Sequence, residues 1–224
     1  MFDDVVVRAM GYVEYTSAWR AMQDFTRSRD ASTTDEIWLL EHPPVYTVGL
    51  KGKRRELAGP EGVPFVRSDR GGDITYHGPG QAIVYVLMDL QRRRWGVKQL
   101  VSSLEQTVID LLDMHGVRGR RRVGAPGVYV ENGKIAALGL RVRRGCSYHG
   151  LALNVDMDLR PFTRIDPCGY PGLAVTQLIE LGVHLAVARV NQLLVAQLAR
   201  NLRYRLAHTV TEQGEIPSSR CSHG

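Results

Sequence analysis

Apolar residues recur along the chain with two spacings, one typical of amphipathic helices and one typical of short buried strands. Helical spacing predicts four helices, over residues 12–27, 97–115, 173–181 and 185–206. Short apolar runs predict strands over residues 5–9, 36–40, 45–49, 65–68, 74–77, 82–88, 128–130, 135–142 and 151–155. The strands cluster in the middle, with helices before, between and after them, so the pattern predicts an α+β fold with a mixed, largely antiparallel sheet.

Breaks in the pattern define the connections and the extent of the domain. Pro43-Pro44 cannot donate to a sheet, so the strand before this pair ends there. Asn132-Gly133 tolerates positive φ and predicts a tight hairpin between the strands on either side. No linker divides the chain, so we expect a single domain over residues 1–206, followed by a polar, flexible tail over residues 207–224.

Length and composition narrow the class of protein. The chain has 224 residues, of which 44% are hydrophobic, which is enough for one globular domain. No run approaches the roughly 20 apolar residues of a membrane span. Asp3 and Asp4 stand where a signal peptide would carry basic residues, so we expect a cytoplasmic protein. Three cysteines, an odd number, do not make a disulfide framework.

Basic residues outnumber acidic ones, and the formal net charge is +6. The excess gathers in three arginine-rich stretches, 92–94, 118–122 and 141–144. Such clusters attract acidic partners, although a merely solvated surface would look the same. Nucleic acid is the commonest acidic partner, but the chain carries no recognised nucleic-acid motif. We therefore expect an acidic partner other than nucleic acid.

Cys168 stands in a loop of prolines and glycines, the segment 166–172 with the sequence DPCGYPG. A core cysteine rarely occupies such a loop, and the helix predicted after it would stabilise a thiolate at its N-terminus. Cys146 and Cys221 lack this setting. Cys168 is therefore the candidate nucleophile, and inert packing is the alternative for any free cysteine.

A nucleophilic cysteine needs a base, because little of an ordinary thiol is ionised near neutral pH. Lys134 follows the hairpin turn, and strict alternation would place it on one face with Ala136, Leu138 and Leu140. Burial on that apolar face disfavours an ammonium ion and would make the amine a proton acceptor. The pattern leaves a second interpretation open, in which Lys134 simply reaches water beside the turn.

Residues 70–81, with the sequence RGGDITYHGPGQ, combine paired glycines with the polar side chains of Arg70 and His77. Glycine lets the backbone approach a ligand closely, so this stretch predicts a ligand-binding segment. It lacks the ending of a phosphate loop and does not form a dinucleotide fingerprint. Cys146 and His149 form a C-x-x-H pair, but no second pair completes four zinc ligands, so we expect no metal.

Four motifs, in this order, resemble those of the lipoyl(octanoyl) transferases, a family related in fold to the biotin and lipoate protein ligases. The motifs are Arg70-Gly71-Gly72 with Thr75-Tyr76-His77-Gly78-Pro79-Gly80-Gln81, Gly133-Lys134-Ile135-Ala136 continuing to Gly139, His149-Gly150-Leu151-Ala152-Leu153-Asn154-Val155, and Pro167-Cys168-Gly169. The resemblance covers residues 5–205 and does not extend to Asp166 or the tail. It implies that residues 1–206 form an acyltransferase catalytic domain with a biotin/lipoate protein ligase-like fold.

The same resemblance implies the site residues and the reaction. It places the family's catalytic cysteine and lysine on Cys168 and Lys134. It places the acyl pocket on Arg70, Gly71, Gly72, Asp73, Ile74, Thr75, Tyr76, His77, Ala137, Leu138, Gly139, Gly150, Leu151 and Ala152. The implied reaction moves an octanoyl group from acyl carrier protein to a lysine of a lipoyl domain, through a thioester on Cys168, in protein lipoylation.

The implied partners are proteins. The donor would be the acidic acyl carrier protein, whose phosphopantetheine carries the acyl group, so no other cofactor is expected. The acceptors would be lipoyl domains of 2-oxoacid dehydrogenase complexes and the glycine cleavage H protein. Three alternatives are an ATP-dependent lipoate ligase, which needs no nucleophilic cysteine, a hydrolase that pairs Cys168 with His149 or His77, and a basic nucleic-acid-binding module. The cysteine favours the transferase.

Overall fold

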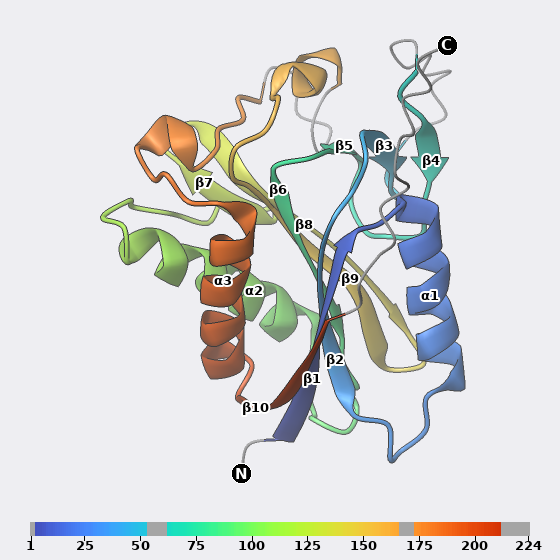
Figure 1. Cartoon of the computed structure of the whole chain (residues 1–224). Helices are drawn as coiled ribbons and strands as arrows, with labels where there is room; N and C mark the ends of the chain where they lie inside the picture. The colour runs from blue at the N-terminus through green and yellow to red at the C-terminus, as the bar shows by residue number, and fades with distance from the viewer. Residues whose placement is uncertain (1–2, 53–61, 166–172, 212–224) are drawn as a thin grey trace, which may run out of the picture.

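The computed structural model describes residues 3–52, 62–165 and 173–211, which fold around one large sheet (Figure 1). Its seven strands lie in the order β10-β1-β2-β6-β9-β8-β7. They are β1 (Asp3–Tyr12), β2 (Asp35–Glu41), β6 (Gln81–Leu87), β7 (Gly127–Val130), β8 (Gly133–Arg143), β9 (Cys146–Asn154) and β10 (Tyr204–Thr211). β1 runs parallel to both of its neighbours, β10 and β2, and the other neighbouring pairs among the described strands of this sheet are antiparallel. The predicted mixed, largely antiparallel sheet is therefore confirmed.

A second sheet of three strands, in the order β4-β3-β5, lies at one end of the large one (Figure 1). Its strands are β3 (Val45–Val48), β4 (Phe65–Arg67) and β5 (Ile74–His77). The loop before β5 contacts the large sheet directly, because the N–H of Gly71 donates to the carbonyl of Leu140 on β8 at 2.8 Å. The small sheet and its loop therefore cover part of the large sheet.

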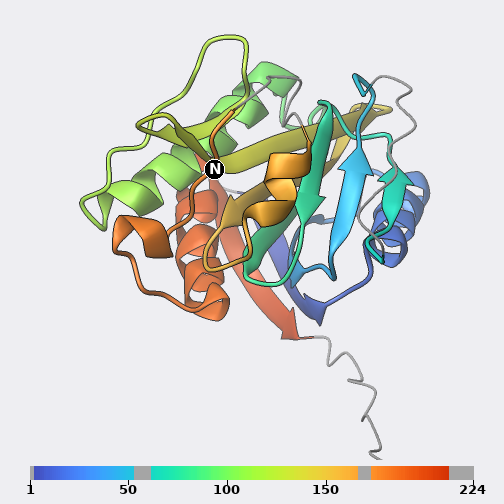
Figure 2. The ribbon, with the colours of Figure 1, turned by 90° about the horizontal axis from the view of Figure 1, so that it is seen from above.

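Three α-helices cover the two faces of the large sheet (Figures 1 and 2). α1 (Tyr15–Ser28) packs on one face, and α2 (Val97–Asp113) and α3 (Val187–Asn201) pack on the other. β6 lies between these layers, and all of its residues are buried, which explains its continuous apolar run. None of the helices in the described part of the chain has the length and apolar character of a membrane span.

The structure departs from the predicted elements after residue 172. The predicted helix over 173–181 is wrong: the segment begins extended, with Val175 bridging Lys134, and ends in a 3₁₀ turn, η3 (Ile179–Leu181). The predicted helix over 185–206 ends at Asn201, and β10 follows it. β10 extends to Thr211, across the boundary expected at residue 206, and the rest of the tail lies outside the described residues.

The predicted β7–β8 hairpin forms, but its loop is displaced by one residue. Val130 pairs with Gly133, so the loop residues are Glu131 and Asn132, and the positive φ of 49° falls on Glu131. Gly133 is needed for a different reason, because a Cβ there would lie 3.0 Å from Thr176. Its small size lets the extended segment 174–176 lie against β8.

Candidate active site

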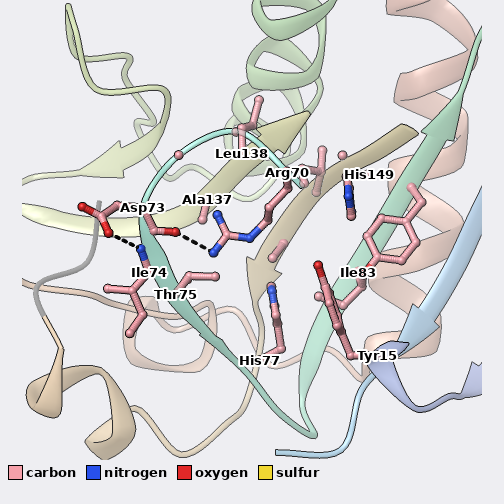
Figure 3. Close-up of a pocket in the computed structure, with 16 residues that line it drawn as sticks. Tyr15, Arg70, Asp73, Ile74, Thr75, His77, Ile83, Ala137, Leu138 and His149 are labelled. Carbon is pink, nitrogen blue, oxygen red and sulfur yellow. Dashed lines mark hydrogen bonds between the residues drawn. The ribbon is translucent and has the colours of Figure 1, made fainter. Parts of the chain in front are cut away.

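A pocket opens between the loop before β5 and the middle of the large sheet (Figure 3). The space between its lining residues is about 490 Å³ when the part open to solvent is included, and about 40 Å³ of it admits the centre of a water-sized sphere. Its lining comes from α1, the loop, β5, β6, β8 and β9: Tyr15, Arg70, Gly72, Asp73, Ile74, Thr75, His77, Ile83, Tyr85, Ala137, Leu138, Gly139, His149, Gly150, Leu151 and Ala152. Twelve of the fourteen residues expected in the acyl pocket are thus brought together from three separate motifs.

The other two expected pocket residues, Gly71 and Tyr76, lie outside this lining. Gly71 acts through its backbone, which anchors the loop to Leu140 as described above. Tyr76 neighbours Thr75 on β5, and alternation along the strand turns its ring to the opposite side. The ring packs against Tyr46 and Phe162, with centroids 5.3 and 5.6 Å away.

Two glycines that face each other across the sheet allow the loop to approach it. Gly139 of β8 pairs with Gly150 of β9. A Cβ on Gly139 would lie 3.0 Å from the carbonyl oxygen of Gly71, and a Cβ on Gly150 would collide with the carbonyl of Val84. A side chain at either position would therefore displace the loop or open the ladder between β6 and β9.

Arg70 fixes the shape of the loop from inside. Its side chain is buried, and it donates to the hydroxyl and carbonyl oxygens of Thr47 at 2.9 and 2.5 Å. It also donates to the carbonyls of Gly71 and Asp73 at 2.9 and 2.7 Å. Because these bonds involve backbone on both β3 and the loop, the guanidinium holds that wall of the pocket in place.

Ring side chains with polar atoms form the opposite wall, where Tyr15 and His149 lie across from Ala137 (Figure 3). Three of them bond to neighbouring side chains: Tyr15 to Ser68 at 2.7 Å, Tyr85 to His42 at 2.6 Å, and His77 to Gln81 at 2.8 Å. Burial lowers the pKa of His77 well below its usual value, so this ring is neutral at pH 7. His77 therefore contributes polar atoms to this wall but no charge.

Sequence reasoning did not assign four of the lining residues to the pocket: Tyr15, Ile83, Tyr85 and His149. Ile83 and Tyr85 alternate on β6, and this spacing is the signal that could have found them once β6 was placed beside β9. Tyr15 reaches the pocket only because α1 docks on this face of the sheet. No local sequence pattern predicts that contact of Tyr15.

Lys134 lies in a smaller cavity beside the pocket. Lys134 is 3% exposed, and its Nζ donates to the carbonyl of Pro126 at 2.9 Å. This finding excludes the interpretation in which Lys134 simply reaches water. Thr75 and Ala137 line both cavities, so the amine stands next to one end of the larger pocket.

A β-bulge follows Lys134 and breaks the alternation on which its face was predicted. Tyr129 of β7 pairs with Lys134, but the preceding Val128 pairs with Ala136. The extra residue means that strict alternation from Lys134 does not carry along β8. Ala137, as well as Ala136, consequently lines the cavity of Lys134.

Of the three cysteines, only Cys146 lies within the described residues, while Cys168 and Cys221 lie outside them, as does Asp166. Cys146 is buried on β9 beside Arg143 and lines neither cavity. Burial raises the pKa of its thiol, which disfavours the reactive thiolate. The described residues contain no group of three or more His, Cys, Asp or Glu side chains placed to hold a metal ion.

The arginine-rich stretches have more than one role. Some of their members form ion pairs with buried carboxylates, among them Arg92 with Asp35 at 2.7 Å and Arg121 with Glu105 at 3.1 Å. Arg122 lies over the hairpin, with Cζ 4.3 Å from the ring centre of Tyr129. Nζ of Lys134 lies 5.4 Å from the centre of the same ring. The basic surface at Arg122 therefore adjoins the lysine site.

Comparison with solved structures shows which fold this is. A putative lipoate protein ligase from T. acidophilum superposes with a TM-score of 0.73 at 17% identity, over 95% of this chain and 90% of that one. Lipoate-protein ligase A bound with ATP superposes with a TM-score of 0.72 at 15% identity, over the same shares of the two chains. At these identities the likeness concerns the fold alone, and it confirms the expected lipoate ligase-like fold.

Sequence comparison shows the family. The model of the lipoyl protein ligase A/B catalytic domain matches residues 14–199. An octanoyltransferase of Thiobacillus denitrificans is 59% identical, over 88% of this chain and 90% of the relative. An octanoyltransferase of Nitrosococcus oceani is 55% identical, over 90% of each. The chain therefore belongs to the octanoyltransferases, acyltransferases built on the lipoyl protein ligase A/B catalytic domain.

Proposed function

We propose that Cys168 receives an octanoyl group from acyl carrier protein as a thioester and passes it to a lysine of a lipoyl domain. The observation that carries this proposal is the buried amine of Lys134, which stands at one end of an apolar pocket. The carbonyl of Ala174 accepts the backbone N–H of Lys134 at 2.8 Å. Cys168 precedes Ala174 by six residues, and a fully extended chain of that length spans about 20 Å.

The larger pocket suits a medium-length alkyl chain. Apolar residues from β6, β8 and β9 line it, including Ile83, Ala137 and Ala152. An octanoyl group has seven carbons beyond its carbonyl, and each buried methylene contributes about 0.8 kcal/mol. With the chain in the pocket, its carbonyl end would lie near Thr75 and Ala137, which also line the cavity of Lys134.

The first half-reaction moves the acyl group onto the protein. The amine of Lys134 takes the proton of the Cys168 thiol, and the thiolate attacks the carbonyl carbon of the carrier-bound thioester. The new bond from sulfur to carbon forms as the bond to the phosphopantetheine sulfur breaks. Lys134 then returns the proton to the departing thiolate, so the carrier leaves as a free thiol.

The second half-reaction makes an amide. A neutral lysine amine of the lipoyl domain attacks the thioester on Cys168 and loses a proton to Lys134. Lys134 delivers that proton to the Cys168 thiolate as the sulfur departs. A thioester lies higher in free energy than the amide formed from it, so transfer runs downhill without ATP and without a cofactor other than the phosphopantetheine of the carrier. The acceptors would be lipoyl domains of 2-oxoacid dehydrogenase complexes and the glycine cleavage H protein.

Intact-mass analysis after mixing the protein with octanoyl carrier protein tests the proposal. The parent and Cys146→Ser should gain the mass of one octanoyl group, and Cys168→Ser should gain none. Addition of a lipoyl domain should then discharge the acyl-enzyme and increase the mass of that domain instead. Transfer that persists in Cys168→Ser, or product formed from free octanoate and ATP, would overturn the thioester route and favour a ligase.

A further inference from the structure

His149 lies on β9 at the edge of the pocket. Its backbone has a conformation that residues other than glycine rarely adopt. Its φ is +61°, and its N–H donates to Sδ of Met22 on α1 at 3.4 Å. The regular pairs between β6 and β9 run as far as Tyr85 with Gly150, the residue that follows His149. Left-handed backbone costs about 1 kcal/mol at a residue with a side chain. The fold therefore positions the ring of His149 at the expense of backbone strain.

Asp69 clamps the ring. Nε2 of His149 lies 3.0 Å from Oδ1 of Asp69, which also accepts a hydrogen bond from Nε1 of Trp19 at 2.8 Å. The hydroxyl of Tyr148 donates to the other carboxylate oxygen. Trp19 of α1 and the neighbouring Tyr148 and His149 of β9 therefore meet at one carboxylate, and the ring has little freedom to turn aside.

The protonation states of His149 and Asp69 leave Nδ1 of the imidazole ring without a proton. Burial lowers the pKa of His149, so the ring is neutral at pH 7. Burial also raises the pKa of Asp69, but hydrogen bonds from His149 and Tyr148 more than offset this effect and lower it overall, so the carboxylate is charged. A neutral ring beside a carboxylate donates from Nε2, which makes Nδ1 an acceptor. Nδ1 is buried and has no hydrogen-bond partner among the described residues.

The position of the ring along the sheet matches the end of an octanoyl chain. Three successive pairs of β8 and β9 line the pocket, from Ala137–Ala152 to Gly139–Gly150, and the next pair is Leu140–His149. Ala137 also lines the cavity of Lys134 and so marks the reacting end. Three residues along a strand span about 10 Å. An extended chain of eight carbons has seven bonds and spans about 9 Å, at roughly 1.25 Å per bond.

We infer that His149, held by Asp69, is the end wall that limits the acyl chain to about the length of octanoyl. This inference rests on the proposed function, because it assumes that an acyl chain occupies the pocket with its carbonyl end near Ala137. A shorter chain leaves apolar surface of the pocket uncovered. A longer chain must press its methyl group against a ring that is pinned on one side by Asp69 and presents an acceptor lone pair on the other. His149 thereby determines chain-length specificity.

His149→Gly is the direct test, because glycine adopts φ +61° without strain and removes the whole ring. We measure kcat/KM with octanoyl, decanoyl and dodecanoyl groups on the same carrier protein. Each further methylene that enters an apolar pocket contributes about fourfold. The ratio of decanoyl to octanoyl should therefore rise on the order of tenfold. His149→Asn, which also tolerates left-handed backbone, should shift the ratio in the same direction by less.

Tyr148→Phe is the matched control, because it removes another hydrogen bond to Asp69 from a neighbouring residue that does not line the pocket. A merely structural role of this network predicts that both variants lower all three rates together and leave the ratios unchanged. Binding of free octanoate and decanoate, measured by calorimetry, gives the same ratio for any variant that folds but no longer turns over.

The outcomes separate this inference from the function on which it rests. An unchanged ratio in His149→Gly, in a parent that transfers octanoyl, overturns the end wall and leaves the function standing. A parent that transfers no acyl group from any thioester overturns both. A raised ratio in His149→Gly together with a parent-like ratio in Tyr148→Phe supports the assignment of His149.

Discussion

Gly139→Ala tests whether the loop before β5 must lie against β8 for the pocket to bind its ligand. The added Cβ would lie 3.0 Å from the carbonyl oxygen of Gly71 and 3.2 Å from Cδ of Arg70. Unstrained contacts to carbon lie at about 3.5 to 4.0 Å. The loop would therefore have to move by about half an ångström to accept the methyl group.

The structure resists that movement. Gly71 is bonded to Leu140 at 2.8 Å, and Arg70 ties the loop to Thr47 of β3 at 2.9 Å. Overpacking against such a fixed neighbour costs about 1 to 3 kcal/mol. For a chain of this size the melting temperature should fall by roughly 2 to 10 °C. If the displaced wall loses contact with about two methylenes of the acyl chain, kcat/KM for octanoyl carrier protein should fall about tenfold.

Thermal melts and steady-state kinetics measure the two effects separately. Gly96→Ala is the matched control, because its Cβ would meet nothing within 4 Å and its φ is −87°. Gly96 caps α2, so this control costs about 1 kcal/mol at most and should leave kcat/KM unchanged. A Gly139→Ala protein with parent-like kinetics would refute the reasoning, since it would show that the pocket does not depend on close contact between the loop and β8.

Three further predictions concern proton transfer, acid stability and docking. Lys134→Ala should slow both acylation of Cys168 and amide formation by about 10² to 10⁴, measured by rapid quench, and unchanged acylation would exclude the proton-transfer role. The folded state lowers the pKa of Asp69, so its contribution to stability is present above the unfolded value and is lost as the pH falls. Melting temperatures of Asp69→Asn should therefore decline less than those of the parent below about pH 4. Replacing both Arg120 and Arg122 by Gln should raise KM for the acidic carrier by up to about tenfold and flatten its salt dependence, while a small thioester serves as the control substrate.

Much of the fold could be predicted because many of its elements are periodic by themselves. The stripe of Leu104 and Val108 predicted α2, and the apolar run of residues 82–88 predicted the strand β6. β10 could not be found in this way, since most of its residues are exposed and only its parallel pairing with β1 makes it a strand. The segment at Val175 was wrongly predicted as a helix for a related reason. Its backbone forms a β-bridge with Lys134, which is distant in the sequence.

The site was predictable only in part, for the same physical reason. Glycine-rich motifs identify loops and strands that approach a ligand, and three such motifs do meet in one pocket. The contact of Tyr15 depends on how α1 packs, which no local spacing encodes, and Tyr85 could be assigned from its spacing only once β6 was placed beside β9. His149 looked like half of a zinc pair with Cys146, but its Nε2 faces Asp69 instead.

The bulge after Lys134 explains how one strand serves both cavities. In a regular strand, alternate side chains would place Lys134 and Ala137 on opposite faces of the sheet. The extra residue between the pairs Tyr129–Lys134 and Val128–Ala136 shifts this alternation. Lys134 and Ala137 consequently line the same cavity, and Ala137 continues into the larger pocket. A bulge re-aims side chains without ending the strand. β8 can therefore hold the amine of Lys134 in one cavity and still form a wall of the adjoining pocket, along which we propose that the acyl chain lies.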